Sequence, residues 1–175
     1  MSLGGRRLGL LVCEDLWAEG HSVNPGAELA AAGADHFLCL SASPFRAGVF
    51  AERLRHGRRL RAPLVYVNAV GANDELIFDG NSLVLDGLGH LLARGRAFEE
   101  DLLLVDLDNP PSAVWFEGSD IEQVYQALLV GIRDYTRKCG FRKVFLGLSG
   151  GIDSAVVCAL AAQALGKDNV TGVTM

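Results

Sequence analysis

The chain has 175 residues, of which 50 % are hydrophobic and 21 % are charged. This balance is typical of a globular protein and excludes a disordered chain, and the length allows one ordinary domain or two small ones. The formal net charge of −5 argues against nucleic acid as the main partner, because surfaces that bind nucleic acids are usually basic. No apolar run approaches the roughly 20 residues of a membrane span, so we expect no membrane partner.

The first part of the chain, residues 8–108, has short apolar runs and few helical stretches. We expect strands at 8–13, 37–40, 64–68, 82–85 and 102–107. We expect helices at 24–33 and 50–61, the first ending at Gly33. The second helix is rich in arginine and predicts a basic, solvated face.

A Pro/Asn-rich stretch predicts an interdomain linker at 109–118, which divides the chain into domains at 1–108 and 119–175. Ser119 and Glu122 form a capping box that begins a helix running to about Cys139. Apolar residues at helical spacing along it are expected to be core. They are Ile121, Val124, Tyr125, Leu128, Ile132 and Tyr135.

The last part of the chain predicts the opening of a parallel α/β domain. A short apolar strand at 143–146 precedes a glycine-rich turn, and an alanine-rich helix at 155–165 follows, closed by Gly166. A second strand begins near Asn169.

The turn between that strand and that helix predicts a phosphate-binding loop, because backbone N–H groups and a helix dipole meet an anion there. Gly150 and Gly151 let a phosphate approach and permit positive φ, and the hydroxyls of Ser149 and Ser154 can add hydrogen bonds. A Walker loop would need a Lys, which is absent here. The alternative is a glycine-rich turn with a Ser/Asp N-cap that binds nothing.

A second motif places Cys13 where the apolar strand 8–13 ends. A thiol there can be exposed on a tight turn beside backbone N–H groups that stabilise an oxyanion. Forming the thiolate needs a base or a cation nearby. The alternative is a small buried hydrophobic residue. The four cysteines, Cys13, Cys39, Cys139 and Cys158, show no CxxC spacing, so we expect no zinc site and a reducing, cytoplasmic location.

The two motifs together resemble a known family. The pattern Ser-Gly-Gly-x-Asp-Ser at 149–154 resembles the pyrophosphate loop of ATP pyrophosphatases, and Val-Cys-Glu-Asp-Leu-Trp at 12–17 resembles the nucleophile strand of nitrilase-like glutaminase domains. Segments 41–45, 66–71 and 74–82 are similar to later stretches of such a domain, and 135–141 and 164–166 to the start of an ammonia-using synthetase domain. Their order on one chain resembles glutamine-dependent NAD synthetase.

The resemblance implies an α/β fold: part of a nitrilase-like α-β-β-α sandwich, followed by the first strand-loop-helix-strand of a Rossmann-like ATP pyrophosphatase domain. It implies a ligase that amidates deamido-NAD to NAD, with ATP as substrate, Mg²⁺ as cofactor and self-association into a homo-oligomer. Cys13 would attack glutamine, Ser43 would contact glutamine, and ammonia would pass through an internal tunnel. Asp153 would lie near the phosphates, as a helix N-cap or through Mg²⁺. The implied ATP-binding residues are Gly147, Leu148, Ser149, Gly150, Gly151, Ile152, Asp153 and Ser154.

The chain also departs from the family pattern. The family's glutaminase uses a Glu and a Lys upstream of the nucleophile, and the residues before Cys13 contain neither. Val49 stands where relatives usually carry a Lys or Arg, for which Arg46 or Arg53 is a candidate substitute. We therefore expect an internal fragment that by itself has neither full activity.

Three other functions remain as alternatives to this one. The chain could be another glutamine-dependent pyrophosphate-loop synthetase, such as GMP or asparagine synthetase. It could also be a non-catalytic remnant that binds nucleotides, or a plain nitrilase-type amidase, which would leave the loop at 147–154 without a role.

Overall fold

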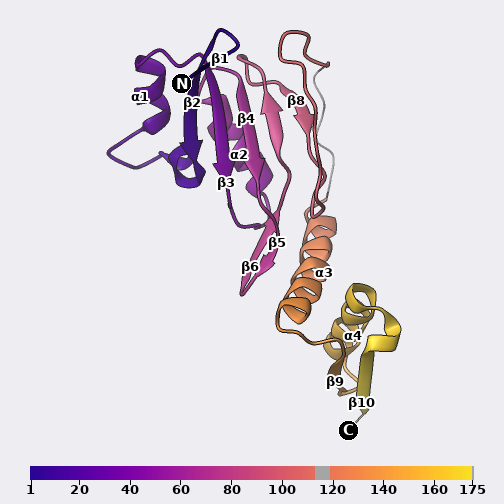
Figure 1. The fold of residues 1–175 in the computed structure, drawn as a ribbon. Helices are drawn as coiled ribbons and strands as arrows, with labels where there is room; N and C mark the ends of the chain where they lie inside the picture. Colours follow the sequence, from indigo (N-terminus) through magenta and orange to yellow (C-terminus); the bar gives the residue numbers. More distant parts are fainter. Residues whose placement is uncertain (113–118, 175) are drawn as a thin grey trace.

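The computed structural model describes residues 1–112 and 119–174, which form a sheet-bearing part and a smaller C-terminal part joined through one long helix, α3 (Figure 1). The termini lie at opposite ends of the molecule. The elements up to α2 are β1 (Ser2–Leu3), β2 (Arg6–Val12), a 3₁₀ turn (Cys13–Trp17), α1 (Pro25–Ala31), β3 (His36–Ser41) and α2 (Val49–Arg58). The elements from β4 to β8 are β4 (Leu64–Asn68), β5 (Val70–Asn73), β6 (Leu76–Asp79), β7 (Leu83–Leu85) and β8 (Leu91–Arg94). The last elements are α3 (Asp120–Lys138), β9 (Val144–Leu148), α4 (Ile152–Leu165), a 3₁₀ turn (Lys167–Asn169) and β10 (Val170–Thr174).

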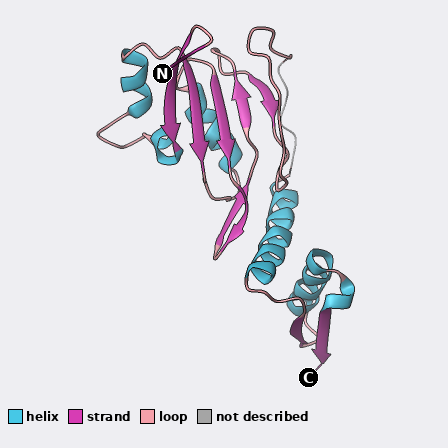
Figure 2. Ribbon diagram, viewed as in Figure 1, coloured by secondary structure: helices cyan, strands magenta, loops and turns pink. Residues whose placement is uncertain are grey.

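The described residues form a main sheet with the strand order β1-β2-β3-β4-β7-β8. Strands β2, β3 and β4 run parallel, and the outer strands pair antiparallel (Figure 2). Because β2 and β3 pair Val12 with Leu40, their carboxyl ends meet at one edge, where Cys13 and Ser41 follow. The sequence-predicted strands at 8–13, 37–40, 64–68 and 82–85 are therefore confirmed to within two residues at each end.

One face of this sheet carries the core. Side chains from β2, β3, β4 and β7 pack there against Phe50 and Leu54 of α2 and Leu29 of α1. The opposite face is also apolar and stays exposed in the described part of the chain. Its exposed residues are Leu10, Val12, Leu40 and Val67. Apolar residues on both faces are typical of parallel strands covered by a second layer, and the sheet with its helices has the form of half of an α-β-β-α sandwich.

Helix α3 packs against the β5–β6 hairpin rather than against the C-terminal part alone. The carboxylate Oδ2 of Asp134 accepts a hydrogen bond from the Ala72 backbone N–H at 3.0 Å, and the Lys138 ammonium donates to the Ala72 carbonyl. Ala72, Phe98, Ala127 and Val130 form a second, smaller core beside these contacts. The hairpin is thus held at its first strand by two charged side chains one helical turn apart.

The C-terminal part has the predicted strand-loop-helix-strand order. Strands β9 and β10 pair in parallel, with Val144 opposite Val170, and α4 connects them. Gly166 follows the last residue of α4 with φ of 85°, a conformation that favours glycine. The prediction of a parallel α/β opening is confirmed.

Two predictions about apolar segments are wrong. Residues 102–107 form no strand; the backbone there pairs with no neighbour in a ladder, and Leu102 and Leu104 are exposed. Residues expected as the core of α3 are largely exposed, because the hairpin covers the adjacent face instead. Tyr135 is 57 % exposed and Ile121 81 %, whereas Ala127, Val130, Asp134 and Thr136 are buried.

The predicted linker falls partly outside the described residues, which omit 113–118, and residues 109–112 have no regular structure. None of the helices within 1–112 and 119–174 has the length and apolar character needed to cross a membrane.

Candidate functional site

Cys13 lies at the carboxyl end of β2, in the first position of the 3₁₀ turn. Its φ is 43°, a left-handed conformation that is uncommon for a residue with a side chain and that concentrates at functional sites. Its Sγ accepts a hydrogen bond from Ser41 Oγ at 3.4 Å, across the β2–β3 edge. The sharp turn is held by Asp15, whose Oδ2 accepts from the Val12 N–H at 2.7 Å. The thiol is therefore partly exposed on a tight turn, which fits the exposed-thiol interpretation better than that of a fully buried hydrophobic residue.

Ser43 lies two residues beyond this edge and is buried. Its backbone N–H donates to Asn68 Oδ1 at 2.9 Å, and its carbonyl accepts from Arg53 Nη2 at 2.9 Å. Arg53 Nη2 also lies 3.3 Å from Ser43 Oγ. The Ser43 side chain and backbone are thus fixed by residues of β4 and α2.

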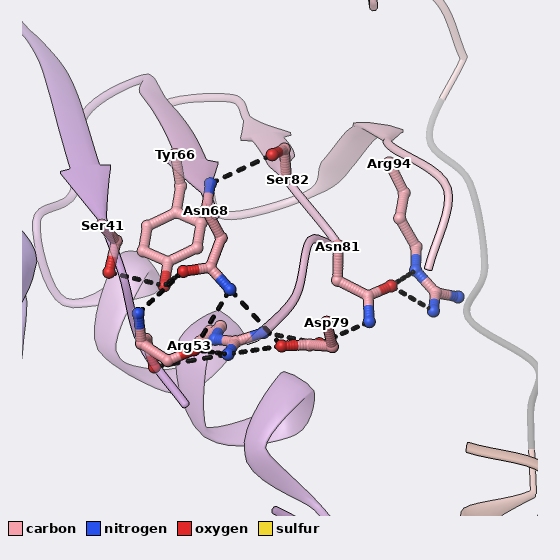
Figure 3. A network of polar contacts seen from close by, with 9 residues as sticks. Ser41, Arg53, Tyr66, Asn68, Asp79, Asn81, Ser82 and Arg94 are labelled. Carbon is pink, nitrogen blue, oxygen red and sulfur yellow. Dashed lines mark hydrogen bonds and ion pairs between the residues drawn. The ribbon is translucent and has the colours of Figure 1, made fainter. Parts of the chain in front are cut away.

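Arg53 is the centre of a buried polar network (Figure 3). Its guanidinium forms two hydrogen bonds of 2.8 Å to the Asp79 carboxylate, and both side chains are 0 % exposed. Asp79 also accepts from Asn81, and Asn81 Oδ1 accepts from Arg94 Nε at 2.8 Å. Burial lowers the pKa of Arg94, partly offset by the Asp79 charge. The prediction of a wholly solvated basic helix is therefore wrong for Arg53, because a carboxylate and a carbonyl compensate its charge inside the core.

Neither arginine offered as a substitute at the Val49 position is free. Val49 is buried at the start of α2. Arg46 is exposed and forms an ion pair with Glu52, which lowers the pKa of the Glu52 carboxyl and raises that of Arg46. Arg53 is committed to Asp79 and Ser43. Arg53 thus holds Ser43 through a hydrogen bond to its carbonyl, and it does not replace a Lys or Arg side chain at position 49.

Residues 147–154 span the junction of β9 and α4. Gly147 and Leu148 end β9 and Ile152 begins α4, so the strand and the helix both extend further into the predicted loop than expected, and the turn itself is residues 149–151. Gly150 has φ of 83°, in the left-handed region, and an added Cβ there would meet no atom within 4 Å. Ser149 Oγ lies 3.3 Å from Ser154 Oγ and accepts from the Gly151 N–H at 3.4 Å. The first helical bond of α4 runs from Ala155 N–H to the Gly151 carbonyl, so the N–H groups of residues 152–154 precede the intrahelical ladder and point at the loop. The arrangement can bind an anion of phosphate size.

Asp153 is not the N-cap of α4. Gly151 occupies that position, with extended φ and ψ and no side-chain cap, and Asp153 lies in the first helical turn. The N-cap alternative for Asp153, and with it the Ser/Asp-capped turn, is therefore wrong. The exposed carboxylate of Asp153 remains available beside the loop.

The two motifs do not meet. Within the described ranges, no hydrogen bond or ion pair joins residues 147–154 to Cys13 or Ser43. A cavity of about 550 Å³ lies over the sheet face beside residues 99–107, and neither Cys13, Ser43 nor residues 147–154 line it. The chemistry of the site therefore rests on Cys13 with its neighbours and, separately, on the loop.

Comparisons with known proteins agree with this division. A family model described as NAD synthase matches residues 124–175. The glutamine-dependent NAD(+) synthetase of Synechocystis sp. is 41 % identical over 97 % of this chain and 33 % of its own length. The structure of a glutamine-dependent NAD+ synthetase from Acinetobacter baumannii in complex with ADP is 36 % identical, with a TM-score of 0.88 over 100 % of this chain and 34 % of that chain. An amidase from Nesterenkonia sp. AN1, modified by acrylamide at its active site cysteine, is 33 % identical with a TM-score of 0.52 over 61 % of this chain and 41 % of that chain.

The fold and the comparisons define an α/β chain that is similar in part to an amidase and whose residues 124–175 match the NAD synthase family model. This chain is a homologue of glutamine-dependent NAD synthetases and spans about a third of the length of the relatives it matches. The resemblance and the fold class predicted from the sequence are confirmed.

Sequence reasoning missed the network behind Ser43. Its members Asn68 and Asp79 end β4 and β6, and Asn81 lies in the connection from β6 to β7, where Asn and Asp are common for local reasons. The available signal was Arg53 itself, a single arginine at helical spacing with the apolar Phe50 and Leu54.

Proposed function

We propose that this chain carries two parts of a glutamine-dependent NAD synthetase: the cysteine that takes ammonia from glutamine and the loop that binds the phosphates of ATP. The observation that carries the proposal is the left-handed Cys13 at a parallel strand end, on the same chain as the strand-loop-helix at 144–165. The ADP-bound relative with a TM-score of 0.88 supports the nucleotide assignment for the loop.

At the first site, the Cys13 thiolate attacks the side-chain amide carbon of glutamine. The amide nitrogen takes up a proton and leaves as ammonia, and the resulting thioester is hydrolysed to glutamate. Ser43 is the proposed glutamine contact, and Arg53 and Asn68 position it through the hydrogen bonds described above. Because the thioester divides one difficult step into two, covalent catalysis suits a poor nitrogen donor such as an amide.

At the second site, the nicotinic acid carboxylate of deamido-NAD attacks the α-phosphate of ATP and releases pyrophosphate. Ammonia then displaces AMP and gives NAD. Gly147–Ser154 supply the phosphate contacts: N–H groups at the start of α4, two hydroxyls and an open left-handed Gly150. These donors would hold the departing pyrophosphate oxygens in place.

Asp153 fits a role as a Mg²⁺ ligand. Mg²⁺ prefers oxygen atoms and commonly binds through one or two carboxylates plus substrate phosphates, and Asp153 offers an exposed carboxylate beside the loop. Among the described residues no group of three or more His, Cys, Asp or Glu side chains could hold a metal alone, so the nucleotide would supply the other oxygens. The bound ion would neutralise charge on the phosphates.

The test is NAD formation from deamido-NAD and Mg-ATP by the natural protein that contains this sequence, with glutamine or ammonium as the nitrogen source. Cys13→Ala should abolish the glutamine-dependent reaction and spare the ammonium-dependent one, because only the first site uses the thiol. Ser149→Ala with Ser154→Ala should reduce both reactions. If neither nitrogen source yields NAD, the proposal fails. If the 175-residue chain binds ADP but the natural protein makes no NAD, a nucleotide-binding protein without turnover is the correct description.

The domain boundaries at 108 and 119, a homo-oligomeric state and a cytoplasmic location stay predictions from the sequence. The exposed apolar face of the sheet supports association with a further layer of structure.

A further inference from the structure

The surroundings of Cys13 contain a chain of hydrogen-bond donors directed at its sulfur. Ser41 Oγ donates to Cys13 Sγ at 3.4 Å, and Tyr66 OH donates to Ser41 Oγ at 3.0 Å. Ser41 lies in β3, Tyr66 lies in β4 and Cys13 directly follows β2, and these three strands are parallel neighbours. Figure 3 shows the Tyr66 ring reaching toward Ser41 at this edge of the sheet. The parallel register therefore brings three distant residues into one line.

The direction of donation follows from the partners. Tyr66 has a single hydroxyl proton, and its second acceptor, Asn68 Oδ1, lies farther away at 3.5 Å and already accepts from the Ser43 N–H. With its oxygen accepting from Tyr66, Ser41 keeps its own proton for the sulfur. Tyr66 is 1 % exposed, and burial raises the pKa of its phenol, so the first donor stays protonated.

We propose that Tyr66 and Ser41 form a two-step donor chain that positions Cys13 Sγ and stabilises it as the thiolate. A donor favours the charged form of the group that accepts from it, and thiolates accept hydrogen bonds more strongly than thiols do. The chain acts through Ser41, so Tyr66 is a positioning residue. The inference rests on the proposed function only in taking Cys13 as the glutaminase nucleophile.

The other groups around Cys13 do not supply this stabilisation. Asp15 of the same turn is an acid whose charge opposes a thiolate, and its Oδ2 is engaged with the Val12 N–H. Cys39 of β3 stays neutral, because burial raises the pKa of its thiol to about 12. On the far side of Tyr66, the Arg53 guanidinium lies 5.8 Å from the ring centroid and is paired with Asp79. Glu14, also in the turn, faces His21 at 3.4 Å.

The experiment measures thiol reactivity rather than turnover. The 175-residue chain is alkylated with iodoacetamide between pH 5 and 10, and the rate at Cys13 is read from its peptide by mass spectrometry. Tyr66→Phe, Ser41→Ala and the hydroxyl-retaining Ser41→Thr are compared with the unmodified sequence. Exposed Cys139 in the same digest is the internal control. Far-ultraviolet circular dichroism confirms that each variant is folded.

In Tyr66→Phe and Ser41→Ala we expect the plot of Cys13 alkylation rate against pH to shift to higher pH by about half a pH unit to one pH unit. The alkylation rate at pH 7 should fall roughly three- to tenfold. Ser41→Thr should keep most of the original profile. Unchanged profiles in both folded variants overturn the proposal, and a shift in Ser41→Ala alone overturns the Tyr66 step. Because glutamine is absent from the assay, failure of the donor chain is distinguishable from failure of the synthetase assignment.

Discussion

The buried pair of Arg53 and Asp79 allows a quantitative test of how Ser43, the proposed glutamine contact, is held in place. Replacing Arg53 by Met removes two 2.8 Å hydrogen bonds to Asp79 and one of 2.9 Å to the Ser43 carbonyl. It leaves a carboxylate that is 0 % exposed without its countercharge. Breaking such a buried pair costs about 3–5 kcal/mol. For a chain of this length that lowers the thermal midpoint by roughly 6–20 °C. Circular dichroism measures the thermal midpoint, and urea unfolding measures the loss of unfolding free energy.

Two further variants separate charge pairing from simple loss of packing. Arg53→Met with Asp79→Leu removes both charges, so we expect it to recover most of the lost stability, as apolar replacements of buried pairs often do. Arg46→Ala breaks the exposed pair with Glu52 and should leave the midpoint nearly unchanged, because exposed pairs are screened by solvent. The reasoning is refuted if Arg53→Met loses less than about 1 kcal/mol, or if the double variant is no more stable than the single one.

Three other outcomes follow from the structure. Burial raises the pKa of the Cys39 thiol from 9.0 to about 12, so its contribution to stability is complete below pH 9 and is lost as the pH rises toward 12. In the folded chain at pH 8.5, iodoacetamide should therefore modify Cys139 and spare Cys39. Equal labelling of the two cysteines would contradict this. Hydrogen bonds from Arg59 and, to a smaller extent, Arg55 lower the pKa of the Glu19 carboxyl from 4.5 to about 2, so its contribution to stability is present above pH 4.5 and is lost as the pH falls toward 2. A carboxyl NMR titration should show this midpoint, and the midpoint should rise in Arg59→Gln. A midpoint near 4.5 in the unmodified chain would disprove the interpretation. Gly150→Ala places a side chain on a residue whose φ is 83°, at a local penalty of about 1–2 kcal/mol. Calorimetry should therefore find weaker ADP binding by this variant. Undiminished affinity would show that ADP binding does not need the left-handed turn.

The strand-turn-helix at 144–165 could be predicted from the sequence because everything that forms it is local. Strand β9, the turn and α4 occupy consecutive residues, and Gly150 marks the turn by the backbone conformation it permits. The position of Cys13 was predictable for the same reason, since an apolar strand ends directly before it. What failed here were the ends of the elements: β9 runs to Leu148, and α4 begins at Ile152 with Gly151, not Asp153, as its N-cap.

The wrong predictions concern segments whose partners lie elsewhere. The run at 102–107 has the composition of a strand, but a strand forms only where a neighbour completes its hydrogen bonds. The apolar stripe of α3 indicates a buried face, yet the β5–β6 hairpin packs on the face that carries Ala127 and Val130. Helical spacing gives the direction of a stripe and says nothing about which element covers it.

The sequence by itself determined the helices, the parallel strands, the two motifs and their order, because strand and helix periodicity and turn chemistry depend on neighbours within a few residues. The tertiary structure alone decided what surrounds each functional group. Tyr66 reaches Ser41, and Ser41 reaches Cys13, only because three parallel strands lie in register, and Arg53 is tolerated inside the core only because Asp79 of another element neutralises it. Registers and buried charge pairs join residues far apart in the chain, and no local pattern specifies those distances.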